Sequence, residues 1–286
     1  MATIIYGSEL SKEIREEMRL KLQFFRNNGM RMPCLAVVLV GDNPASISYV
    51  KGKQKACASI GMDSLEVVMD ASVKQDTLNE KLKELSMNPH VDGILLQLPL
   101  PNGLSEDAAI ANIIPEKDVD GLTPSNFGRL FLGQPCFTPC TPSGIMELLK
   151  RMNCDPNGKH AVVVGRSKLV GTPVARLLQN ANATVTICHS HTKNLRDMTK
   201  QADILIAAVG KANLFDETYI KKDAYVIDVG VNRLENGNLC GDVDFERVKD
   251  VCKAITPVPK GVGPMTITML LKNTIMAYER GVNYGE

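Results

Sequence analysis

The sequence predicts an α/β protein of two domains, each built on a mostly parallel sheet. Short apolar runs rich in β-branched residues alternate with helical stretches, an order that gives parallel strands joined by right-handed crossovers. This alternation occurs twice, before and after a segment rich in proline and glycine. At 286 residues, the chain is long enough for two domains with sizeable cores.

The first series of elements contains three strands and three helices. Strands are predicted at residues 35–40, 64–69 and 93–98. Helices are predicted at residues 8–28, 43–61 and 73–87. Ligands of parallel sheets bind at the carboxyl ends of the strands, so Gly41 and Gln97 mark a candidate cleft.

The helix at residues 43–61 has a recognisable start and end. Asn43 suits the N-cap, Pro44 the first helical position, and Gly61 the C-terminal stop. Tyr49 and Lys53 are four residues apart, so they project from the same face. A phenol beside an ammonium group can bind a flat polar ring and move protons. A surface tyrosine and a surface lysine are the ordinary alternative.

The second series follows a region of loops and short helices at residues 99–142. Its strands are predicted at residues 161–164, 183–188, 203–208 and 225–229. Its helices are predicted at residues 141–151, 172–180 and 264–280. Asn236-Gly237 is a hairpin-turn signal, and Gly165 and Gly230 mark a second candidate cleft at strand ends.

Composition narrows the class of protein. Lysine and arginine number 33 against 32 acidic residues, a net charge of +1, so no overall bias favours nucleic acid or a membrane surface. No apolar run reaches the length of a membrane span, and residues 1–9 lack the features of a secretory signal. The eight cysteines are scattered, which fits a reducing compartment, and we expect a cytoplasmic protein without a metal site.

A glycine-containing turn follows the strand at residues 161–164. It reads Gly165-Arg166-Ser167 and then Val170-Gly171-Thr172 before the next helix. Backbone N–H groups of such a turn, with the helix N-terminus, suit a pyrophosphate. The two glycines are six residues apart, which departs from the usual Gly-x-Gly-x-x-Gly spacing, so an ordinary tight turn is the alternative.

The next strand end favours NADP over NAD. A site for NAD usually has Asp or Glu about twenty residues after the turn, to accept from the ribose 2′-hydroxyl. Here the strand at residues 183–188 leads into residues 189–193, which offer hydroxyl and imidazole groups and no carboxylate. The Arg166 guanidinium from the turn suits a 2′-phosphate.

These motifs together resemble the bifunctional 5,10-methylenetetrahydrofolate dehydrogenase/5,10-methenyltetrahydrofolate cyclohydrolase family. The resemblance covers nearly the whole chain, from Leu39-Val40-Gly41 to Gly263-Pro264-Met265-Thr266. The other matching motifs are Tyr49-Val50-Lys51-Gly52-Lys53, Gln97-Leu98-Pro99-Leu100-Pro101, Lys117-Asp118-Val119-Asp120-Gly121, Pro139-Cys140-Thr141-Pro142, Gly165-Arg166-Ser167 and Thr256-Pro257-Val258-Pro259.

The resemblance implies a domain arrangement and a set of partners. A folate-binding catalytic domain would occupy residues 1–140 and be completed by the C-terminal helix at residues 264–286. A Rossmann-like NADP-binding domain would occupy residues 141–263, with the active site in the cleft between the domains. The resemblance also implies a homodimer that acts on tetrahydrofolate derivatives in one-carbon metabolism.

The resemblance assigns site residues by position. The catalytic residues are Lys53, Tyr49, Gln97 and Asp120. The folate-binding residues are these four together with Leu98, Pro259, Gly263 and Thr266. The NADP-binding residues are Gly165, Arg166, Ser167, Ser190 and Val231.

The implied chemistry divides the work between two steps. Moving a hydride from the folate methylene to the nicotinamide needs alignment more than acid or base. Hydrolysing the resulting methenyl cation to 10-formyltetrahydrofolate needs proton transfers, for which Lys53 is the best candidate, oriented by Gln97. Tyr49 would stack beside the folate rings, and Asp120 would accept hydrogen bonds from the pterin. Taken alone, Asp120 could be a helix cap and Gln97 a strand-end amide.

One position departs from the family pattern. The family loop usually reads Pro-Gly-Gly-Val-Gly, whereas residues 259–263 of this chain have Lys260 at the second position. A side chain there leaves the geometry of the folate loop open. Lys260 either meets a carboxylate of the folate glutamate tail or remains solvated.

Two other functions stay open at this point. One is a dehydrogenase without cyclohydrolase activity, against which the presence of both Lys53 and Gln97 argues. The other is a catalytically inactive folate- or nucleotide-binding regulator.

Overall fold

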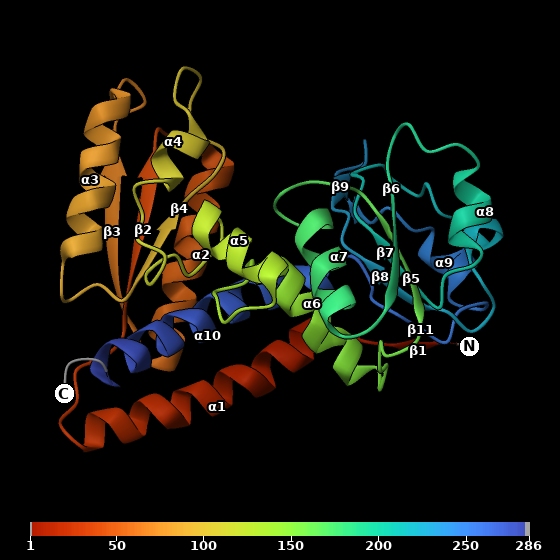
Figure 1. Cartoon of the computed structure of the whole chain (residues 1–286), viewed down its shortest axis with the longest axis horizontal. Coiled ribbons are helices and arrows are strands. Elements are labelled where there is room, and N and C mark those ends of the chain that lie inside the picture. Colours follow the sequence, from red (N-terminus) through yellow and green to blue (C-terminus); the bar gives the residue numbers. More distant parts are fainter. Residues whose placement is uncertain (1, 284–286) are drawn as a thin grey trace. The chain divides into compact units, whose positions relative to one another are not determined.

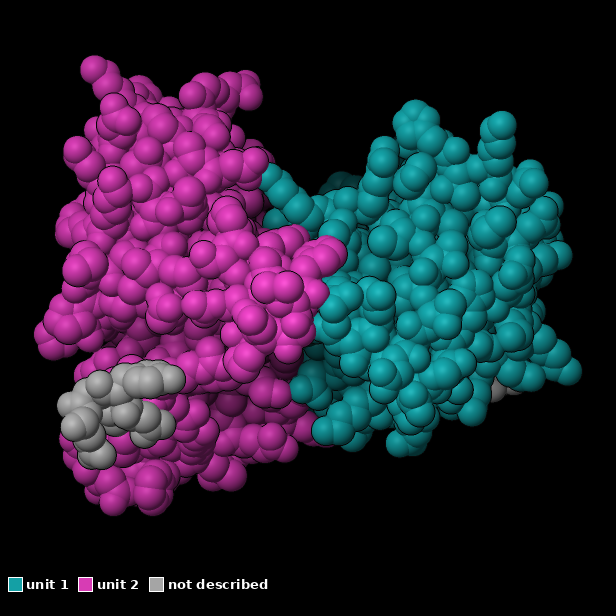
Figure 2. Space-filling view, viewed as in Figure 1, with its two compact units in different colours: residues 1–12, 139–266 teal, residues 13–138, 267–286 magenta. Residues whose placement is uncertain are grey.

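The computed structural model describes residues 2–283 and confirms the α/β class with two units (Figure 1). Unit 1 comprises Met1–Lys12 and Pro139–Thr266, and unit 2 comprises Glu13–Thr138 and Ile267–Glu286 (Figure 2). The divisions before Glu13 and after Thr266 fall within the two long helices α1 (Gly7–Asn27) and α10 (Val262–Asn283).

Unit 2 is built on a three-stranded parallel sheet of order β3-β2-β4. Its strands are β2 (Cys34–Val40), β3 (Asp63–Met69) and β4 (Gly93–Leu96). Its shorter helices are α2 (Pro44–Ile60), α3 (Gln75–Met87), α4 (Glu106–Ile110) and α5 (Pro124–Leu132). Leucines of α3 and apolar residues of α4 pack with β2 and β4 in one buried cluster. The edge strand β3 remains mostly exposed.

Unit 1 is built on a six-stranded parallel sheet of order β1-β11-β8-β7-β5-β6. The strands are β1 (Thr3–Ile4), β5 (His160–Val164), β6 (Thr184–Cys188), β7 (Ile204–Ala207), β8 (Tyr225–Asp228) and β11 (Ala254–Ile255). The helical elements are α6 (Cys140–Arg151), α7 (Gly171–Asn180), α8 (Leu195–Thr199), η1 (Glu217–Tyr219) and α9 (Phe245–Val248).

The predicted hairpin at Asn236-Gly237 is confirmed. It joins the antiparallel strands β9 (Asn232–Arg233) and β10 (Leu239–Cys240). Gly237 has a φ of 84°, a left-handed conformation that glycine adopts without a steric penalty.

The N-terminus corrects the expected domain division. Residues 1–140 were assigned to one domain, but the first twelve residues belong to unit 1. The reason is that β1 adds to the sheet of unit 1, where Thr3 pairs with Ala254 and Ile4 with Ile255. The backbone N–H of Ser8 also donates to the carbonyl of Lys260, at 3.0 Å. These pairings are non-local, and the short segment gives no periodic signal of its own.

The third predicted strand is shorter than expected. The sequence predicts a strand over residues 93–98, whereas β4 ends at Leu96. The N–H of Gln97 still donates to the carbonyl of Val38, and the chain then leaves the sheet towards Pro99, which has no N–H to donate.

The helices of residues 2–283 include none that combines the length and the apolar character needed to cross a membrane.

Candidate active site

Helix α2 supplies the first two site residues, and its predicted ends are confirmed. The Asn43 side chain accepts from the N–H groups of Ala45 and Ser46, and Gly61 closes the helix with a φ of 80°. Tyr49 is 61 % exposed, and Lys53 is half-buried. The helix therefore presents a phenol that is open to a ligand and an amine that is partly withdrawn from water.

The structure brings Lys53 and Gln97 together from elements 44 residues apart. Lys53 Nζ donates to Gln97 Oε1 at 2.8 Å. Gln97 Nε2 donates to the carbonyl of Leu98 at 2.6 Å, which fixes the amide with its oxygen towards the lysine. Gln97 is 9 % exposed at the carboxyl end of β4. The glutamine is thus placed to hold the lysine side chain in one position.

Asp120 is half-buried in a turn that is fixed to the same sheet. The N–H of Ile94 in β4 donates to the carbonyl of Lys117 at 2.8 Å. Asn273 of α10 donates through Nδ2 to the carbonyl of Val119 at 2.8 Å. The residues just before Asp120 are therefore fixed within unit 2, which places the backbone that carries its carboxylate.

Asp118 is a residue whose part in the site the sequence did not predict. It is 2 % exposed, and its carboxylate accepts from the N–H groups of Leu122 and Thr123 and from Asn126 Nδ2. Asp118 therefore closes the turn that carries Asp120. Its partners are at most eight residues away, but nothing in their residue types distinguishes this turn from an ordinary helix start.

Of the other predicted folate residues, Leu98 follows β4 in unit 2, whereas Pro259 lies in unit 1 just before α10, and Gly263 and Thr266 lie in the first turns of that helix. Pro259 and Gly263 are exposed, and Thr266 is half-buried. The hydroxyl groups of Thr266 and Thr141 form a hydrogen bond at 2.8 Å. This bond joins the start of α10 to the start of α6.

Lys260, which stands at a glycine of the family pattern, adopts a backbone conformation that favours glycine. Its φ is 81°, in the left-handed region that favours glycine. A Cβ on the next residue, Gly261, would lie 2.3 Å from the carbonyl oxygen of Pro257. The lysine is therefore held in a strained backbone conformation next to a closely packed Gly261.

We expect Lys260→Gly to stabilise the protein by about 0.5–1 kcal/mol. The change removes a left-handed Cβ, worth about 1–2 kcal/mol, and is partly offset by the greater freedom of glycine in the unfolded chain. Urea unfolding measures the difference. Lys260→Ala is the control, because it keeps the Cβ; equal stability of the two variants would contradict the strain. A raised KM of the alanine variant for a folate with a glutamate tail would assign the lysine to that tail.

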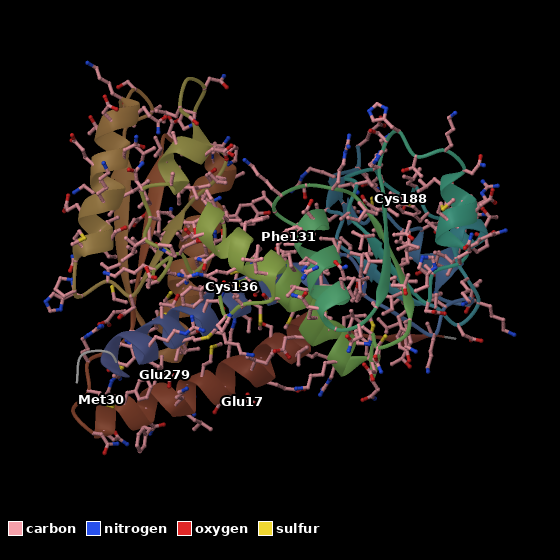
Figure 3. All side chains as sticks on the ribbon, in the orientation of Figure 1. Glu17, Met30, Phe131, Cys136, Cys188 and Glu279 are labelled. Atoms are coloured by element: carbon pink, nitrogen blue, oxygen red, sulfur yellow. The ribbon has the colours of Figure 1, made fainter. Side chains whose placement is uncertain are left out.

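In unit 1, four strands end in one row at the carboxyl edge of the sheet. The register pairs Val164 of β5 with Cys188 of β6 and with Ala207 of β7, and it pairs Ala207 with Asp228 of β8. Figure 3 labels Cys188 at the end of β6. All five predicted cofactor residues follow these strand ends: Gly165, Arg166, Ser167, Ser190 and Val231. The structure therefore gathers them along one edge of the sheet.

The glycine turn after β5 is closely packed. A Cβ on Gly171 would lie 2.2 Å from the carbonyl oxygen of Gly165, and one on Gly165 would lie 2.2 Å from that of Ala208. Ser167 Oγ accepts from the N–H of Val170 at 3.2 Å. Only glycine fits these contacts, so the unusual spacing still gives a tight strand-to-helix turn at the N-terminus of α7.

The loop after β6 is held by its own side chains. The N–H of His189 donates to Thr192 Oγ1 at 2.8 Å, and the N–H of His191 donates to His189 Nδ1 at 3.2 Å. Ser190 is exposed between the two histidines. The loop thus offers a hydroxyl group and imidazoles beside the glycine turn. Among the described residues, no group of three or more His, Cys, Asp or Glu side chains is arranged to hold a metal ion.

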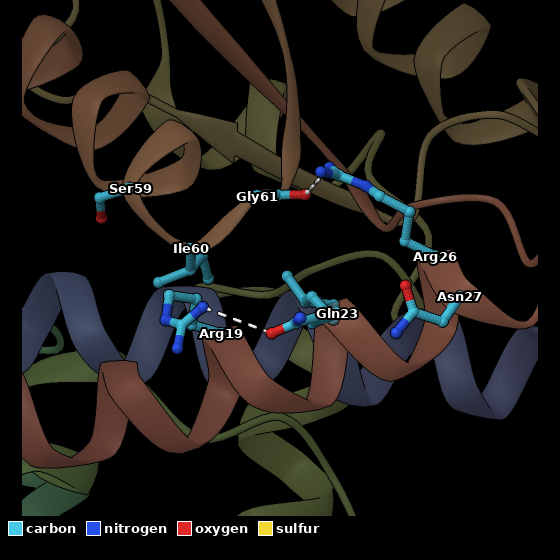
Figure 4. A pocket seen from close by; sticks show the side chains of 8 residues that line it. Arg19, Gln23, Arg26, Asn27, Ser59, Ile60 and Gly61 are labelled. Atoms are coloured by element: carbon cyan, nitrogen blue, oxygen red, sulfur yellow. Dashed lines mark hydrogen bonds between the residues drawn. The ribbon is translucent and has the colours of Figure 1, made fainter.

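A pocket of unit 2 lies apart from these residues, between α1 and the end of α2 (Figure 4). Arg19, Gln23 and Arg26 line it with Gly61. Arg19 is paired with Glu16 at 2.7 Å, and Arg26 approaches the carbonyl of Gly61 at 3.5 Å. Its arginines therefore make contacts within the protein, and no predicted site residue lines the pocket.

The sheet of unit 1 has a tight glycine turn at its carboxyl edge, and unit 2 holds a lysine against a glutamine. Together these features define an α/β enzyme that uses a nucleotide. Two family models cover most of the chain. Residues 5–120 match the tetrahydrofolate dehydrogenase/cyclohydrolase catalytic domain, and residues 139–282 match the NAD(P)-binding domain of the same name. The chain belongs to the tetrahydrofolate dehydrogenase/cyclohydrolase family.

Individual relatives agree with this assignment over nearly their full length. The bifunctional protein FolD of Geobacillus thermodenitrificans is 55% identical over 276 residues, which cover 96% of this chain and 97% of the relative. The crystal structure of the FolD enzyme of Campylobacter jejuni is 48% identical, with a TM-score of 0.96, and the match covers 98% of this chain and 99% of that one. The Trypanosoma brucei enzyme, solved with NADP and an inhibitor, is 38% identical, with a TM-score of 0.93 and 98% of each chain covered.

Proposed function

We propose that this protein oxidises 5,10-methylenetetrahydrofolate to 5,10-methenyltetrahydrofolate with NADP and then hydrolyses the product to 10-formyltetrahydrofolate. The observation that carries the proposal is the hydrogen bond between Lys53 Nζ and Gln97 Oε1, at 2.8 Å, in a chain with both domains of the family. It supports the hydrolytic step in addition to the oxidation.

In the first step, the residues bind and align the reactants. NADP, when bound, accepts the hydride of the folate methylene group, and the folate becomes a cation delocalised over two nitrogens. Tyr49, which is 61 % exposed on α2, offers an aromatic face to the folate rings. The Asp120 carboxylate accepts from the amino and ring N–H groups of the pterin and fixes its orientation.

In the second step, Lys53 moves protons. Water adds to the methenyl carbon and gives up both of its protons as the formyl C=O forms: one passes to the ring nitrogen when the carbon–nitrogen bond breaks, and the other is released to solvent. The Lys53 amine relays these protons. Gln97 accepts from Lys53 and donates to Leu98, so it keeps the amine aimed at one place.

The cofactor assignment to NADP has support at the carboxyl edge of the unit 1 sheet. The turn at Gly165 and the N-terminus of α7 suit the pyrophosphate. Arg166 and Ser190 provide a guanidinium and a hydroxyl group for the 2′-phosphate, and residues 189–193 contain no carboxylate that would repel it.

One pair of assays tests the proposed function. Formation of NADPH from 5,10-methylenetetrahydrofolate measures the first step, and the decay of methenyl absorbance measures the second. Activity in the first assay alone would identify a dehydrogenase without cyclohydrolase activity. Binding of folate or NADP without either activity would identify a regulator.

We further propose that the protein is a cytoplasmic homodimer that pairs through the edge strand β3. Among residues 2–283, β3 has a strand neighbour, β2, on one side only. Leu65 and Val68 on this strand are 39 % and 63 % exposed. An edge strand with free backbone groups and exposed apolar side chains is typical of a surface that pairs with a second copy.

We expect Val68→Asp to convert the dimer into monomers. In the dimer, a carboxylate at this place would have to be buried against the second copy without a partner of opposite charge. Sedimentation or light scattering measures the mass. Met87→Asp is the matched control, because Met87 is an apolar residue that is 78 % exposed on another element, at the end of α3. A dimer that persists in the Val68 variant would rule out β3 as the interface.

A further inference from the structure

Two buried carboxylates of unit 1 have no part in the proposed chemistry. Asp228 is the last residue of β8 and is 3 % exposed, and Asp242 follows β10 and is 0 % exposed. Burial raises the pKa of Asp228 to about 7, and the charge of Asp242 acts in the same direction. Two acidic groups in such surroundings are unfavourable unless many donors meet them, so their partners indicate what they do.

Asp228 accepts hydrogen bonds from three backbone N–H groups. Its Oδ1 accepts from Gly230 at 3.1 Å and from Asp242 at 2.9 Å. Its Oδ2 accepts from Val243 at 3.0 Å. Asp228 therefore ties the loop after β8 to the segment that follows the β9–β10 hairpin.

Asp242 accepts from three consecutive N–H groups of the loop after β7. Oδ2 accepts from Val209 at 2.6 Å and from Gly210 at 3.0 Å, and Oδ1 accepts from Lys211 at 2.8 Å. Oδ1 also accepts from Asn232 Nδ2 at 3.0 Å. Asp242 therefore joins the loop after β7 to the segment that follows β8.

Glycines on each segment make room for the carboxylate of the other. A Cβ on Gly230, after β8, would lie 2.1 Å from Asp242 Oδ1. A Cβ on Gly241 would lie 1.7 Å from Asp228 Oδ2. The backbone is thus shaped around both carboxylates, and neither glycine tolerates a side chain without displacing them.

The two joined loops lie at the proposed cofactor edge. Ala207 and Asp228 pair in the last row of the sheet, so residues 208–211 and 229–232 leave it side by side. Val231, which is 60 % exposed, stands between Gly230, which donates to Asp228, and Asn232, which donates to Asp242. The exposed surface between these anchor points is where a bound nucleotide would lie.

We propose that Asp228 and Asp242 are positioning residues for the cofactor: together they fix the loops after β7 and β8 in the one arrangement that NADP meets. This inference rests on the proposed function, because it takes NADP to bind at this edge. It assigns the carboxylates no contact with the cofactor. They act through backbone N–H groups and through Asn232, which turn the loops into a preformed surface.

Asp242→Asn tests the proposal, because the amide keeps the shape of the side chain but replaces one acceptor with a donor. We expect the Kd for NADP, measured by titration of the purified protein, to rise about tenfold. The Kd for the folate substrate should remain within about twofold of the wild-type value, because the Asp242 carboxylate contacts only the loops at the proposed cofactor edge. Circular dichroism confirms that the variant is folded at the temperature used.

Asp203→Asn is the matched control at the opposite edge of the same sheet. Asp203 also accepts from a backbone N–H, that of His160 at 2.9 Å, and it pairs with Lys221 at 2.6 Å. A loss of stability alone should appear in both variants, whereas weaker NADP binding should appear only in Asp242→Asn.

An exchange of donor and acceptor gives the sharpest readout. Asn232→Asp added to Asp242→Asn restores this one link with the roles reversed, while the N–H of Lys211 still faces the new amide, so the Kd for NADP should recover only in part, by about threefold relative to Asp242→Asn. If Asp242→Asn does not fold, Asn232→Ala removes only this link and should still weaken NADP binding by about threefold. A folded variant that binds NADP as tightly as the wild type would overturn the inference, while a wild-type protein that binds no NADP would overturn the proposed function instead.

Discussion

Lys53→Arg is expected to lower the hydrolysis of methenyltetrahydrofolate by two or more decades while part of the dehydrogenase activity survives. Arginine keeps a cation and hydrogen-bond donors near Gln97, but with a pKa above about 12 it cannot give up a proton to act as a base. One general acid–base group contributes on the order of 10²–10⁴ in rate. Hydride transfer requires only that the substrate be aligned with the cofactor, so we expect its rate to fall less than the rate of hydrolysis.

Lys53→Met separates the proton relay from the hydrogen bond. Methionine keeps the length of the side chain but cannot donate to Gln97 Oε1, where Lys53 Nζ donates at 2.8 Å. The buried amide oxygen then loses that donor, and we expect both activities to fall. Comparing Lys53→Arg with Lys53→Met shows how much of the lost activity is due to proton transfer and how much to the hydrogen bond that positions the side chain against Gln97.

The decay of methenyl absorbance and the formation of NADPH measure the two steps separately. Lys51→Arg and Lys55→Arg are matched controls, because both lysines are exposed on the same helix α2. They should leave both rates unchanged. Hydrolysis of the methenyl cation by Lys53→Arg at the wild-type rate would falsify the role of Lys53.

The sequence predicted helix α2 well because its signals are local. Asn43, Pro44 and Gly61 set the ends through contacts with their immediate neighbours, and the structure shows these caps. The spacing of Tyr49 and Lys53 then follows from the helical period alone. Gln97, the residue that meets Lys53, was predicted from its place at the end of a parallel strand and from the family motif that it begins, because no local pattern links the two residues.

Elements that depend on distant partners were missed. The strands β1 and β11 have two residues each, and they exist because Thr3 pairs with Ala254 across most of the chain. Two residues carry no periodicity, so the sequence placed the N-terminus with the wrong unit. Prediction failed here because the stabilising contacts are non-local.

Asp228 and Asp242 also could not be predicted from the sequence, because their contacts are non-local. Asp242 accepts from Val209, 33 residues earlier in the chain, and Asp228 accepts from Val243, 15 residues later. An aspartate that holds a distant loop has the same local appearance as one that caps a turn. The sequence identifies groups that face a ligand by motif, whereas their supports become visible only in three dimensions.

Arg166→Ala is expected to raise the KM for NADP by about one to two decades and to change the KM for NAD far less. Arg166 is exposed in the turn after β5, on the row of strand ends that also leads to Ser190. Under the proposed assignment, a guanidinium there would pair with the 2′-phosphate, which NAD lacks. One charge-assisted contact with phosphate is worth roughly 1.5–3 kcal/mol, which gives the expected change in KM.

Lys168→Ala is the matched control, since Lys168 is an exposed cation two residues further along the same turn. Its loss lowers the general positive charge by the same amount, so a purely electrostatic effect would appear equally in both variants and would weaken at high salt. A specific pairing should appear only in Arg166→Ala. Equal losses for NADP and NAD in that variant would place Arg166 at the pyrophosphate or in the structure of the turn, and the preference for NADP would then have to come from Ser190 and its neighbours.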